Sequence, residues 1–426
     1  MARALSGIFV CGAAALAVTP ALAQQPVSAN QSLFNRDRNI SVTQRARPGY
    51  DPVPVPIGAF IAAPKLDVGA EFNDNIYASE TAKTGDTIIT VNPEVDLASN
   101  WDRNSLQAFA RSATRDYTKK SSESTTDYQI GGAGMLQAGH GQLSAGGDTG
   151  ELTEPRTSTQ TSSVSASPIR YQQSDLFVSG VQEFNRVRLT ARFDLADMDY
   201  HNGKTAAGTS VFQDDRDRTN TVYSGKAEYA VSPDTSIYLN GSYNDHHYRL
   251  NPPTVPLDRD SHGTQIGVGA SFDLSHLVRG DVQIGYLKQD FASRTFSTAS
   301  GLSALGRVEW FPTDLTTVTL TGSRGIQDSA VGGSAVYLAE IAGIEADHEL
   351  LRNLILVGRA GFENDNYQGV DRKDRNANAY IGAKYLLNRL VGLNVGYSYI
   401  DQNSSGATPG PKYTVNKFTI STTLQF

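Results

Sequence analysis

The sequence predicts an all-β protein, a transmembrane antiparallel β-barrel of the bacterial outer-membrane type. Three observations predict it: alternating segments from about Pro64 to the end, an apolar N-terminal segment typical of secretion, and a last strand that ends on Phe426. Alternation with a period of two indicates strands with one apolar and one polar face. Such strands cross a membrane only as a closed barrel, because lipid cannot satisfy an open sheet edge.

The first 23 residues read as a signal peptide. Arg3 gives a positive start, Leu5 to Val18 is a short apolar stretch, and Ala21-Leu22-Ala23 is a small-x-small cleavage site before Gln24. The apolar stretch is too short for a spanning helix. Because Cys11 is the one cysteine of the sequence, the mature protein would have no disulfide and no cysteine-based metal or redox chemistry.

Residues 24–57 are expected to form an extended periplasmic leader that contains several prolines. The segments 45–48 (Arg-Ala-Arg-Pro) and 52–56 (Pro-Val-Pro-Val-Pro) disfavour both helix and sheet. The barrel itself is expected to span residues 58–426.

The strands are recognised by their apolar faces. Clear examples are the segments 66–72, 187–195, 223–229, 266–272 and 393–399, in which every second residue is apolar or aromatic. Counting such segments gives about 18 strands, with 16 possible, and single-chain bacterial barrels have an even number. Residues 168–184 could be one strand or two. One strand keeps both termini periplasmic and is the expectation here.

The turns come in two sizes that tend to alternate along the chain. Short turns are expected at 139–141, 232–234, 312–314 and 388–389, and longer polar loops at 119–123, 155–167, 202–215, 250–258 and 402–412. Short periplasmic turns and longer extracellular loops are typical of outer-membrane barrels. The loop 202–215 is the expected candidate for a segment that folds inward and narrows the pore.

The terminal strand resembles the signal that outer-membrane barrels present to their assembly machinery. Its apolar face carries Phe418, Ile420, Leu424 and Phe426, and these residues are the candidate assembly signal. Outer-membrane lipid and the barrel assembly machinery are therefore the expected partners. The expected location is the outer membrane of a Gram-negative bacterium, reached through a cleaved signal peptide.

Composition excludes some alternatives. Without Arg3 the chain keeps 36 basic and 44 acidic residues, a net charge of −8, so nucleic acid is not an expected partner. A soluble β-solenoid would need a fixed repeat, which the sequence lacks. A soluble sandwich would bury the apolar faces against each other, and the strand pattern alone leaves that possibility open.

One stretch resembles a known family. Residues 64–77 contain Asn73-Asp74-Asn75 before Tyr77, and 86–101 contain Asn92-Pro93 with Leu97, followed by Trp101. Together with 352–354 (Arg-Asn-Leu), they resemble the putative beta-barrel porin 2 family of proteobacterial outer-membrane proteins. The resemblance implies an integral outer-membrane barrel, and some relatives are encoded with exopolysaccharide export machinery. It supplies no catalytic residues.

Catalytic motifs are missing from the sequence, so an enzyme is not expected. Neither G-x-S-x-G nor H-E-x-x-H nor a phosphate-binding P-loop occurs. The rival reading, an enzyme at the barrel rim, would use His201 with Asp214, Asp215 and Asp217. His246 and His247 are adjacent on a strand and point to opposite faces, so one metal ion cannot easily bind both. No cofactor and no metal site are predicted.

The polar strand faces form the candidate site. If the apolar faces meet lipid, the opposite faces line the lumen, with charges of both signs and no ring of one sign. Cross-strand ion pairing is the plain structural reading of each such charge. The candidate pore-lining residues are Arg111, Arg115, Arg188, Arg192, Asp194, Lys226, Glu228, Arg307, Glu309, Arg359, Glu363 and Lys384.

Three functions fit this pattern. A barrel of 16 to 18 strands is wide enough for an aqueous channel. The first expectation is a conduit for exported exopolysaccharide, which would work with periplasmic export proteins and use Phe109 and Tyr380 as sliding contacts. The second is a passive porin for small polar solutes. The third is a structural or adhesive surface barrel whose lumen is plugged, with the leader at 24–57 as one candidate plug.

Overall fold

The computed structural model describes residues 40–160, 165–274 and 277–426. In this part of the chain one sheet contains 19 strands, and all of them except the short β1 form a closed antiparallel barrel of 18 strands. The predicted fold class and strand count are therefore confirmed. The signal peptide at 1–23, with its cleavage site and Cys11, and the first part of the leader lie outside the described residues.

Neighbouring barrel strands follow one another in the sequence, so the sheet is a simple up-and-down meander. The barrel strands are β2 (Phe60–Asn73), β3 (Asp86–Ser99), β4 (Ser105–Tyr117), β5 (Thr125–Ala138), β6 (Gly141–Thr153), β7 (Arg170–Phe184), β8 (Val187–Tyr200), β11 (Arg218–Ser232), β12 (Thr235–Tyr248), β13 (Ser261–Leu274), β14 (Val278–Phe291), β15 (Ala299–Thr313), β16 (Thr316–Asp328), β17 (Val336–Leu351), β18 (Leu354–Tyr367), β19 (Lys373–Leu386), β20 (Val391–Ser405) and β21 (Tyr413–Gln425). The additional elements are β1 (Val55–Ile57), β9 (Gly203–Lys204), β10 (Ser210–Val211) and the 3₁₀ turns η1 (Ser121–Glu123) and η2 (Asp214–Arg216).

The barrel closes where the first long strand meets the last. β2 pairs with β21 from Lys65 opposite Gln425 to Asn73 opposite Lys417. Across this seam the rings of Phe72 and Phe418 lie 6.2 Å apart. Closure satisfies the backbone groups that an edge strand would expose to lipid.

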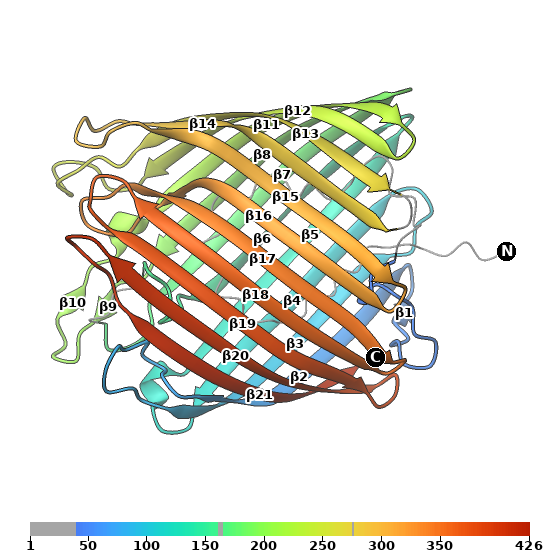
Figure 1. Ribbon diagram of the computed structural model, residues 1–426, viewed down its shortest axis with the longest axis horizontal. Coiled ribbons are helices and arrows are strands. Elements are labelled where there is room, and N and C mark those ends of the chain that lie inside the picture. Colours follow the sequence, from blue (N-terminus) through green and yellow to red (C-terminus); the bar gives the residue numbers. More distant parts are fainter. Residues whose placement is uncertain (1–39, 161–164, 275–276) are drawn as a thin grey trace.

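The two ends of the barrel differ. Short turns lie at one end, together with the C-terminus and β1, and the long loops lie at the other end, where β9 and β10 form a small hairpin (Figure 1). The segment 170–184 is the single strand β7, so the 18-strand count holds and the 16-strand alternative is wrong. We call the end with the short turns periplasmic and the end with the long loops extracellular.

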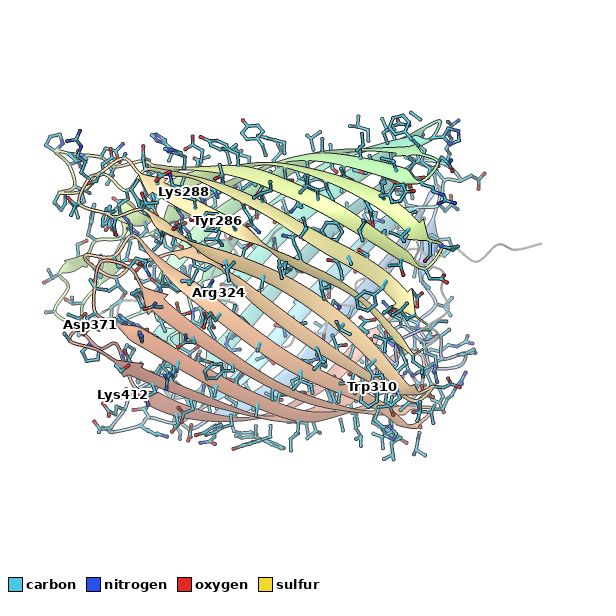
Figure 2. The ribbon with its side chains drawn as sticks, turned by 45° about the horizontal axis from the view of Figure 1, so that its top comes forward. Tyr286, Lys288, Trp310, Arg324, Asp371 and Lys412 are labelled. Carbon is cyan, nitrogen blue, oxygen red and sulfur yellow. The ribbon has the colours of Figure 1, made fainter. Side chains whose placement is uncertain are left out.

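The outer surface is apolar, as the alternation predicts. Ile284, Leu302 and Ile381 are between 65% and 69% exposed and point away from the barrel. Figure 2 shows Trp310 near the periplasmic end, and Tyr286 with Lys288 toward the extracellular end. Aromatic residues at both borders of an apolar band are typical of barrels in a bilayer. No helix in the described residues is long and apolar enough to span a membrane.

The described part of the leader is not extended throughout. Val55–Ile57 form β1, which pairs with Phe60–Ala62 of β2, although the prolines were expected to prevent pairing. A proline can occupy such an edge strand because its missing N–H faces away from the partner strand. Upstream, residues 41–51 fold into two turns, closed by the N–H of Arg45 to the carbonyl of Ser41 and by the N–H of Asp51 to the carbonyl of Arg47.

Candidate functional site in the barrel lumen

The lumen is lined by the strand faces opposite the apolar surface. On β8, for example, Leu189 is 43% exposed on the outer side, so Arg188 and Arg192 face inward. The pairing register extends this assignment from strand to strand. By this register, the inward faces carry all the candidate residues: Arg111, Arg115, Arg188, Arg192, Asp194, Lys226, Glu228, Arg307, Glu309, Arg359, Glu363 and Lys384. Their contribution to conduction stays a prediction.

Several of these charges pair along one strand. The closest nitrogen–oxygen distances are 2.6 Å for Arg192 with Asp194, 3.9 Å for Lys226 with Glu228, and 2.8 Å for Arg307 with Glu309. Residues two apart share a face of a strand, which explains the pattern. The sequence placed these pairs on one face but expected pairing across strands. Arg307 remains 53% exposed despite its partner and is accessible from the lumen.

Other candidates contact residues on neighbouring strands. Arg359 pairs with Glu345 at 2.5 Å, and Arg111 donates to the amide of Gln129 at 2.9 Å. Arg115 pairs with Glu71 at 2.9 Å. Arg188 lies 3.9 Å from Glu183 of β7, and Glu363 shares its strand face with Asp365. Lys384 of β19 lies opposite Ile355 of β18.

Glu71 is the centre of a buried cluster in which Arg115 was predicted to line the lumen and Lys417 was not. Its side chain is 1% exposed and lies between Arg115 and Lys417, with Lys417 at 3.7 Å. Lys417 was not identified as a lumen residue. The alternation of the terminal strand does indicate its position, because Lys417 shares the polar face of that strand with Thr419. A buried carboxylate between two cations stiffens the wall beside the closing seam.

Several inward aromatic rings lie beside cations. The guanidinium of Arg111 lies 4.9 Å from the ring of Phe109, and that of Arg359 lies 5.4 Å from Tyr380. The same contact joins Arg192 to Phe177 at 4.5 Å and Lys226 to Tyr238 at 3.8 Å. Cation–π contacts of this kind hold both side chains against the wall. Phe109 and Tyr380, expected as sliding contacts, therefore have partners within the wall.

The loop between β6 and β7 crosses the lumen. The amide of Gln160 donates to the hydroxyl of Tyr367 at 3.0 Å, and the hydroxyl of Tyr413 donates to the carbonyl of Thr157 at 2.5 Å. Tyr367 ends β18, which lies nine strands from β7 in either direction around the closed sheet. The loop therefore reaches the opposite wall. We call its residues 154–160 the crossing segment.

A second segment bends inward to meet the first. β16 pairs with β15 only as far as Arg324 opposite Ala304. Beyond this point Ile326 and Val336 are buried against Leu287 and Ala299, which lie on the inner face of β14 and β15. The tip of the β16–β17 hairpin thus lies inside the barrel. We call residues 326–338 the inturned tip.

The crossing segment and the inturned tip are bonded to each other and to the wall. The N–H of Ala330 donates to the side-chain oxygen of Gln160 at 2.6 Å. Asp328 accepts from Arg218 at 3.0 Å and lies 3.0 Å from Nδ1 of His246. Arg218 lies on β11 and His246 on β12. The tip of the β16–β17 hairpin is therefore bonded to the wall formed by β11 and β12. Together the two segments narrow the extracellular half of the lumen.

Buried ion pairs fix the start of the crossing segment. Glu154 pairs with Arg216 of η2 at 2.7 Å, and Arg156 pairs with Glu123 of η1 at 2.8 Å. Burial is the largest single influence on the pKa of the Arg216 guanidinium and lowers it, but the charge and hydrogen bonds of Glu154 together with the nearby Tyr200 leave the pKa above its ordinary value. The guanidinium also lies 4.0 Å from the ring centre of Tyr200. Arg216 therefore remains charged and holds Glu154 in place.

The loop 202–215 was expected to narrow the pore, and the structure contradicts this. Its strands β9 and β10 form a hairpin at the extracellular end (Figure 1). The hairpin contacts the neighbouring loop, where the N–H of Ala166 donates to the carbonyl of Lys204. The hairpin pairs with itself and leaves the lumen free. The loop 155–167, which the sequence marked only as long and polar, supplies the crossing residues instead.

The adjacent histidines, and Asp217 of the rival enzyme reading, have structural partners. His246 is buried beside Asp328, whereas His247 is 68% exposed beside Asp260, so the two point to opposite faces as predicted. Asp217 accepts the N–H of Tyr200 and pairs with Arg249. Burial raises the pKa of Asp217 above its ordinary value, despite these partners. Among the described residues no cluster of His, Cys, Asp and Glu could hold a metal ion.

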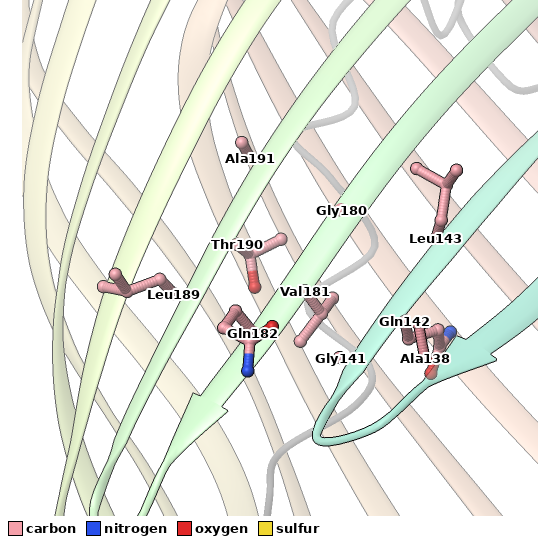
Figure 3. Close-up of a pocket in the computed structure, with 10 residues that line it drawn as sticks. All are labelled: Ala138, Gly141, Gln142, Leu143, Gly180, Val181, Gln182, Leu189, Thr190 and Ala191. Carbon is pink, nitrogen blue, oxygen red and sulfur yellow. The ribbon is translucent and has the colours of Figure 1, made fainter.

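One hollow lies on the outer wall and is not part of the lumen. It measures about 400 Å³ and is lined by residues of β5–β8 near their periplasmic turns (Figure 3). Leu143 and Leu189 flank it, and Gly180 and Ala191 leave room between them. Leu143 and Leu189 are about half exposed and face lipid. The hollow therefore faces the hydrocarbon and offers no site for a polar solute.

The family follows from a comparison with known families. The description of the matching family is "Putative beta-barrel porin 2", and the match covers residues 47–426. The chain belongs to this family. The resemblance inferred from residues 64–101 is thereby confirmed, and with it an integral outer-membrane β-barrel of the porin type. No curated protein matches the sequence.

Solved structures that resemble this one include proteins of Acinetobacter baumannii and Pseudomonas aeruginosa. OccAB3 of Acinetobacter baumannii is 12% identical with a TM-score of 0.46, and the match covers 87% of this chain and 100% of that one. OpdL of Pseudomonas aeruginosa is 13% identical with a TM-score of 0.45 and the same coverage. OpdK of Pseudomonas aeruginosa with vanillate is 12% identical with a TM-score of 0.46, and covers 86% and 99%. These are similarities of fold and do not identify a substrate.

Proposed function

We propose that this outer-membrane barrel is a narrow channel through which small polar solutes diffuse. The observation that supports this best is the crossing segment, whose Gln160 is bonded to Tyr367 on the opposite wall. A barrel of 18 strands is wide enough for an aqueous channel. A segment that spans such a barrel leaves room for small solutes and obstructs a hydrated polymer.

The lumen charges support a solute that is polar but not strongly of one sign. Basic residues and carboxylates lie two positions apart on the inward faces of β8, β11 and β15 and form local pairs. Strong ion selectivity comes from rings of one sign, so this wall favours weak selectivity. Lipid on the outside and mixed charge on the inside are what a general diffusion channel needs.

Export of an exopolysaccharide is the second candidate. Inward aromatic rings such as Phe109 and Tyr380 favour it, because sugars present apolar faces to such rings. Export would require the crossing segment and the inturned tip to move aside, and it would involve periplasmic export proteins. The rings would also have to give up their contacts with Arg111 and Arg359.

Solute size separates the two candidates. Purified protein is placed in liposomes, and swelling rates are measured with a monosaccharide, a disaccharide and a long maltodextrin. We expect rates that fall steeply with solute size. A maltodextrin that enters as fast as the monosaccharide would contradict the proposed function. In cells, a clean deletion is scored for surface polysaccharide and for solute uptake, and a lost coat with unchanged uptake would favour export.

A further inference from the structure

The periplasmic mouth of the barrel contains a patch that is unusual for a lumen wall. Ile355 and Val357 of β18 and Leu386 of β19 are apolar and lie on the inward face. Farther along the same inward faces, Arg359 and Glu363 of β18 and Lys384 of β19 are charged. Apolar side chains that face water are unfavourable, so such a patch requires cover.

Residues of the leader provide the cover. Val42 is 0% exposed and packs with Ile355 and Leu386, and Tyr50 packs against the same cluster. The N–H of Val42 donates to the hydroxyl of Thr317 on β16 at 3.0 Å. The two turns of residues 41–51 thus lie inside the barrel and not in the periplasm beside it.

Charge completes the fit between the leader and the wall. Arg47 is 5% exposed and its guanidinium lies 3.2 Å from the carboxylate of Glu349 on β17, which is 4% exposed. The same guanidinium donates to the carbonyl of Val42 at 2.6 Å, which closes the leader around it. Arg279 of β14 donates to the side chain of Gln44 at 3.1 Å. The contacts reach from β14 to β19.

We infer that the inner wall of β14–β19 is a binding site for residues 41–51 of the same chain, and that these residues are a displaceable plug of the periplasmic mouth. Within the described residues the chain connects the bound segment to the barrel through the edge strand β1, so the segment can leave the mouth without unfolding a barrel strand. Release would widen the periplasmic entrance. The inference assumes a conducting lumen but does not depend on which solute passes.

Docking is measured first, without reference to conduction. A Val42→Cys variant in a Cys11→Ser background is treated with a polar maleimide from the periplasmic side. We expect slow labelling, and labelling about a hundredfold faster when Arg47→Glu or Glu349→Arg is added, because each change breaks a buried ion pair. The combination of Arg47→Glu with Glu349→Arg restores the pair with reversed charges and should restore slow labelling.

Matched controls define the outcome. Val53→Cys reports an exposed leader position, since Val53 is 61% exposed, and Arg103→Glu reverses an exposed charge in the periplasmic turn 100–104. Arg103→Glu should leave the labelling of Val42→Cys unchanged. If Val42→Cys reacts as fast as Val53→Cys in the otherwise unaltered protein, the leader is not docked and the inference is overturned.

Plugging is measured in planar bilayers. A variant that lacks residues 40–51 should conduct more than the full chain, and a synthetic peptide with the sequence of 40–51 should reduce this conductance from the periplasmic side only. Millimolar peptide is required, because a short tether supplies an effective concentration of about that order. Glu349→Arg in the deleted variant should abolish the block.

The failure of this inference differs from that of the proposed function. Slow labelling of Val42→Cys with equal conductance of the full and shortened chains would show docking without plugging, and would overturn the plug. A shortened chain that conducts more than the full chain but also admits long maltodextrins would contradict the size limit of the proposed function. The inference that residues 41–51 plug the mouth would still stand.

Discussion

Gln160 and Tyr367 form a 3.0 Å hydrogen bond across the barrel, although eight strands lie between β7 and β18 in either direction around the sheet. The bond joins a loop to the last residue of a strand, so it can break while the sheet stays intact. The inturned tip meets the same glutamine through Ala330. The extracellular narrowing therefore depends on a few polar contacts between a rigid wall and two segments.

The first prediction concerns the hydroxyl groups that hold the crossing segment. Replacing both Tyr367 and Tyr413 by phenylalanine removes the bonds to Gln160 and Thr157 and leaves the rings in place. Each bond stabilises the crossing position by about 1 kcal/mol, which is about fivefold in population. We expect larger conductance and more frequent transitions in planar-bilayer recordings.

A tyrosine outside the lumen is the control for this change. Tyr223 is 53% exposed on the lipid-facing side of β11, so Tyr223→Phe should leave the conductance unchanged. Equal recordings from the double variant and the original protein would show that the crossing segment does not limit the current.

The second prediction concerns the inturned tip. Asp328→Asn removes the carboxylate that Arg218 and His246 share. Loss of one partner of a buried ion pair costs about 3–5 kcal/mol. We expect the tip to become sensitive to protease added from the extracellular side, and the unheated folded form to convert to the unfolded form at lower temperature on a gel.

An exposed pair in the neighbouring strand is the control for the tip. Lys288 and Asp290 of β14 form an ion pair at 2.6 Å near the loop end. Exposed pairs contribute little to stability, so Asp290→Asn should not change the conversion temperature. The same temperature for Asp328→Asn and Asp290→Asn would show that the tip is not held by Asp328.

The wall of the barrel was predictable because its signal is local. Alternation at a period of two assigns Arg192 inward and Leu189 outward without any knowledge of neighbouring strands. The same rule gave the strand count and the division into short turns and long loops. The pairing of Arg192 with Asp194 along one strand was not predicted, because the sequence indicated pairing across strands, although their spacing of two puts them on one face.

The contents of the lumen were not predictable in the same way. The crossing of loop 155–167 depends on Gln160 reaching Tyr367, 207 positions later in the sequence. The docking of Val42 depends on Ile355 and Leu386, whose apolar inward faces resemble those of outward positions when read alone. Loop length made 202–215 the obvious candidate for the narrowing. Internal pairing of β9 with β10 directs that loop elsewhere.

The third prediction concerns assembly. Deletion of Phe426 should lower the amount of folded barrel in the outer membrane while export continues, because the terminal strand closes the sheet against β2. The N–H of Phe426 donates to the carbonyl of Pro64 at 3.2 Å, and its ring is 51% exposed. Heat-modified gel migration of membrane fractions measures the folded fraction.

Phe212→Ala is the control, because it changes an equally exposed ring in an extracellular loop and should have no effect. A full yield of folded protein without Phe426 would remove its role in assembly.

The fourth prediction concerns ion selectivity. Arg188→Glu with Arg192→Glu reverses two charges on the inward face of β8, one of them beside Asp194. The local electrostatic potential in the lumen then becomes more negative, so we expect the reversal potential in a salt gradient to shift toward cation preference.

The control is Arg170→Glu, because Arg170 lies on the outer face of β7 beside Glu151 and is 44% exposed. Its reversal should leave the potential unchanged. A shift of the same size in both proteins would indicate a general charge effect, and an unchanged potential in the double variant would show that β8 does not line the conducting path.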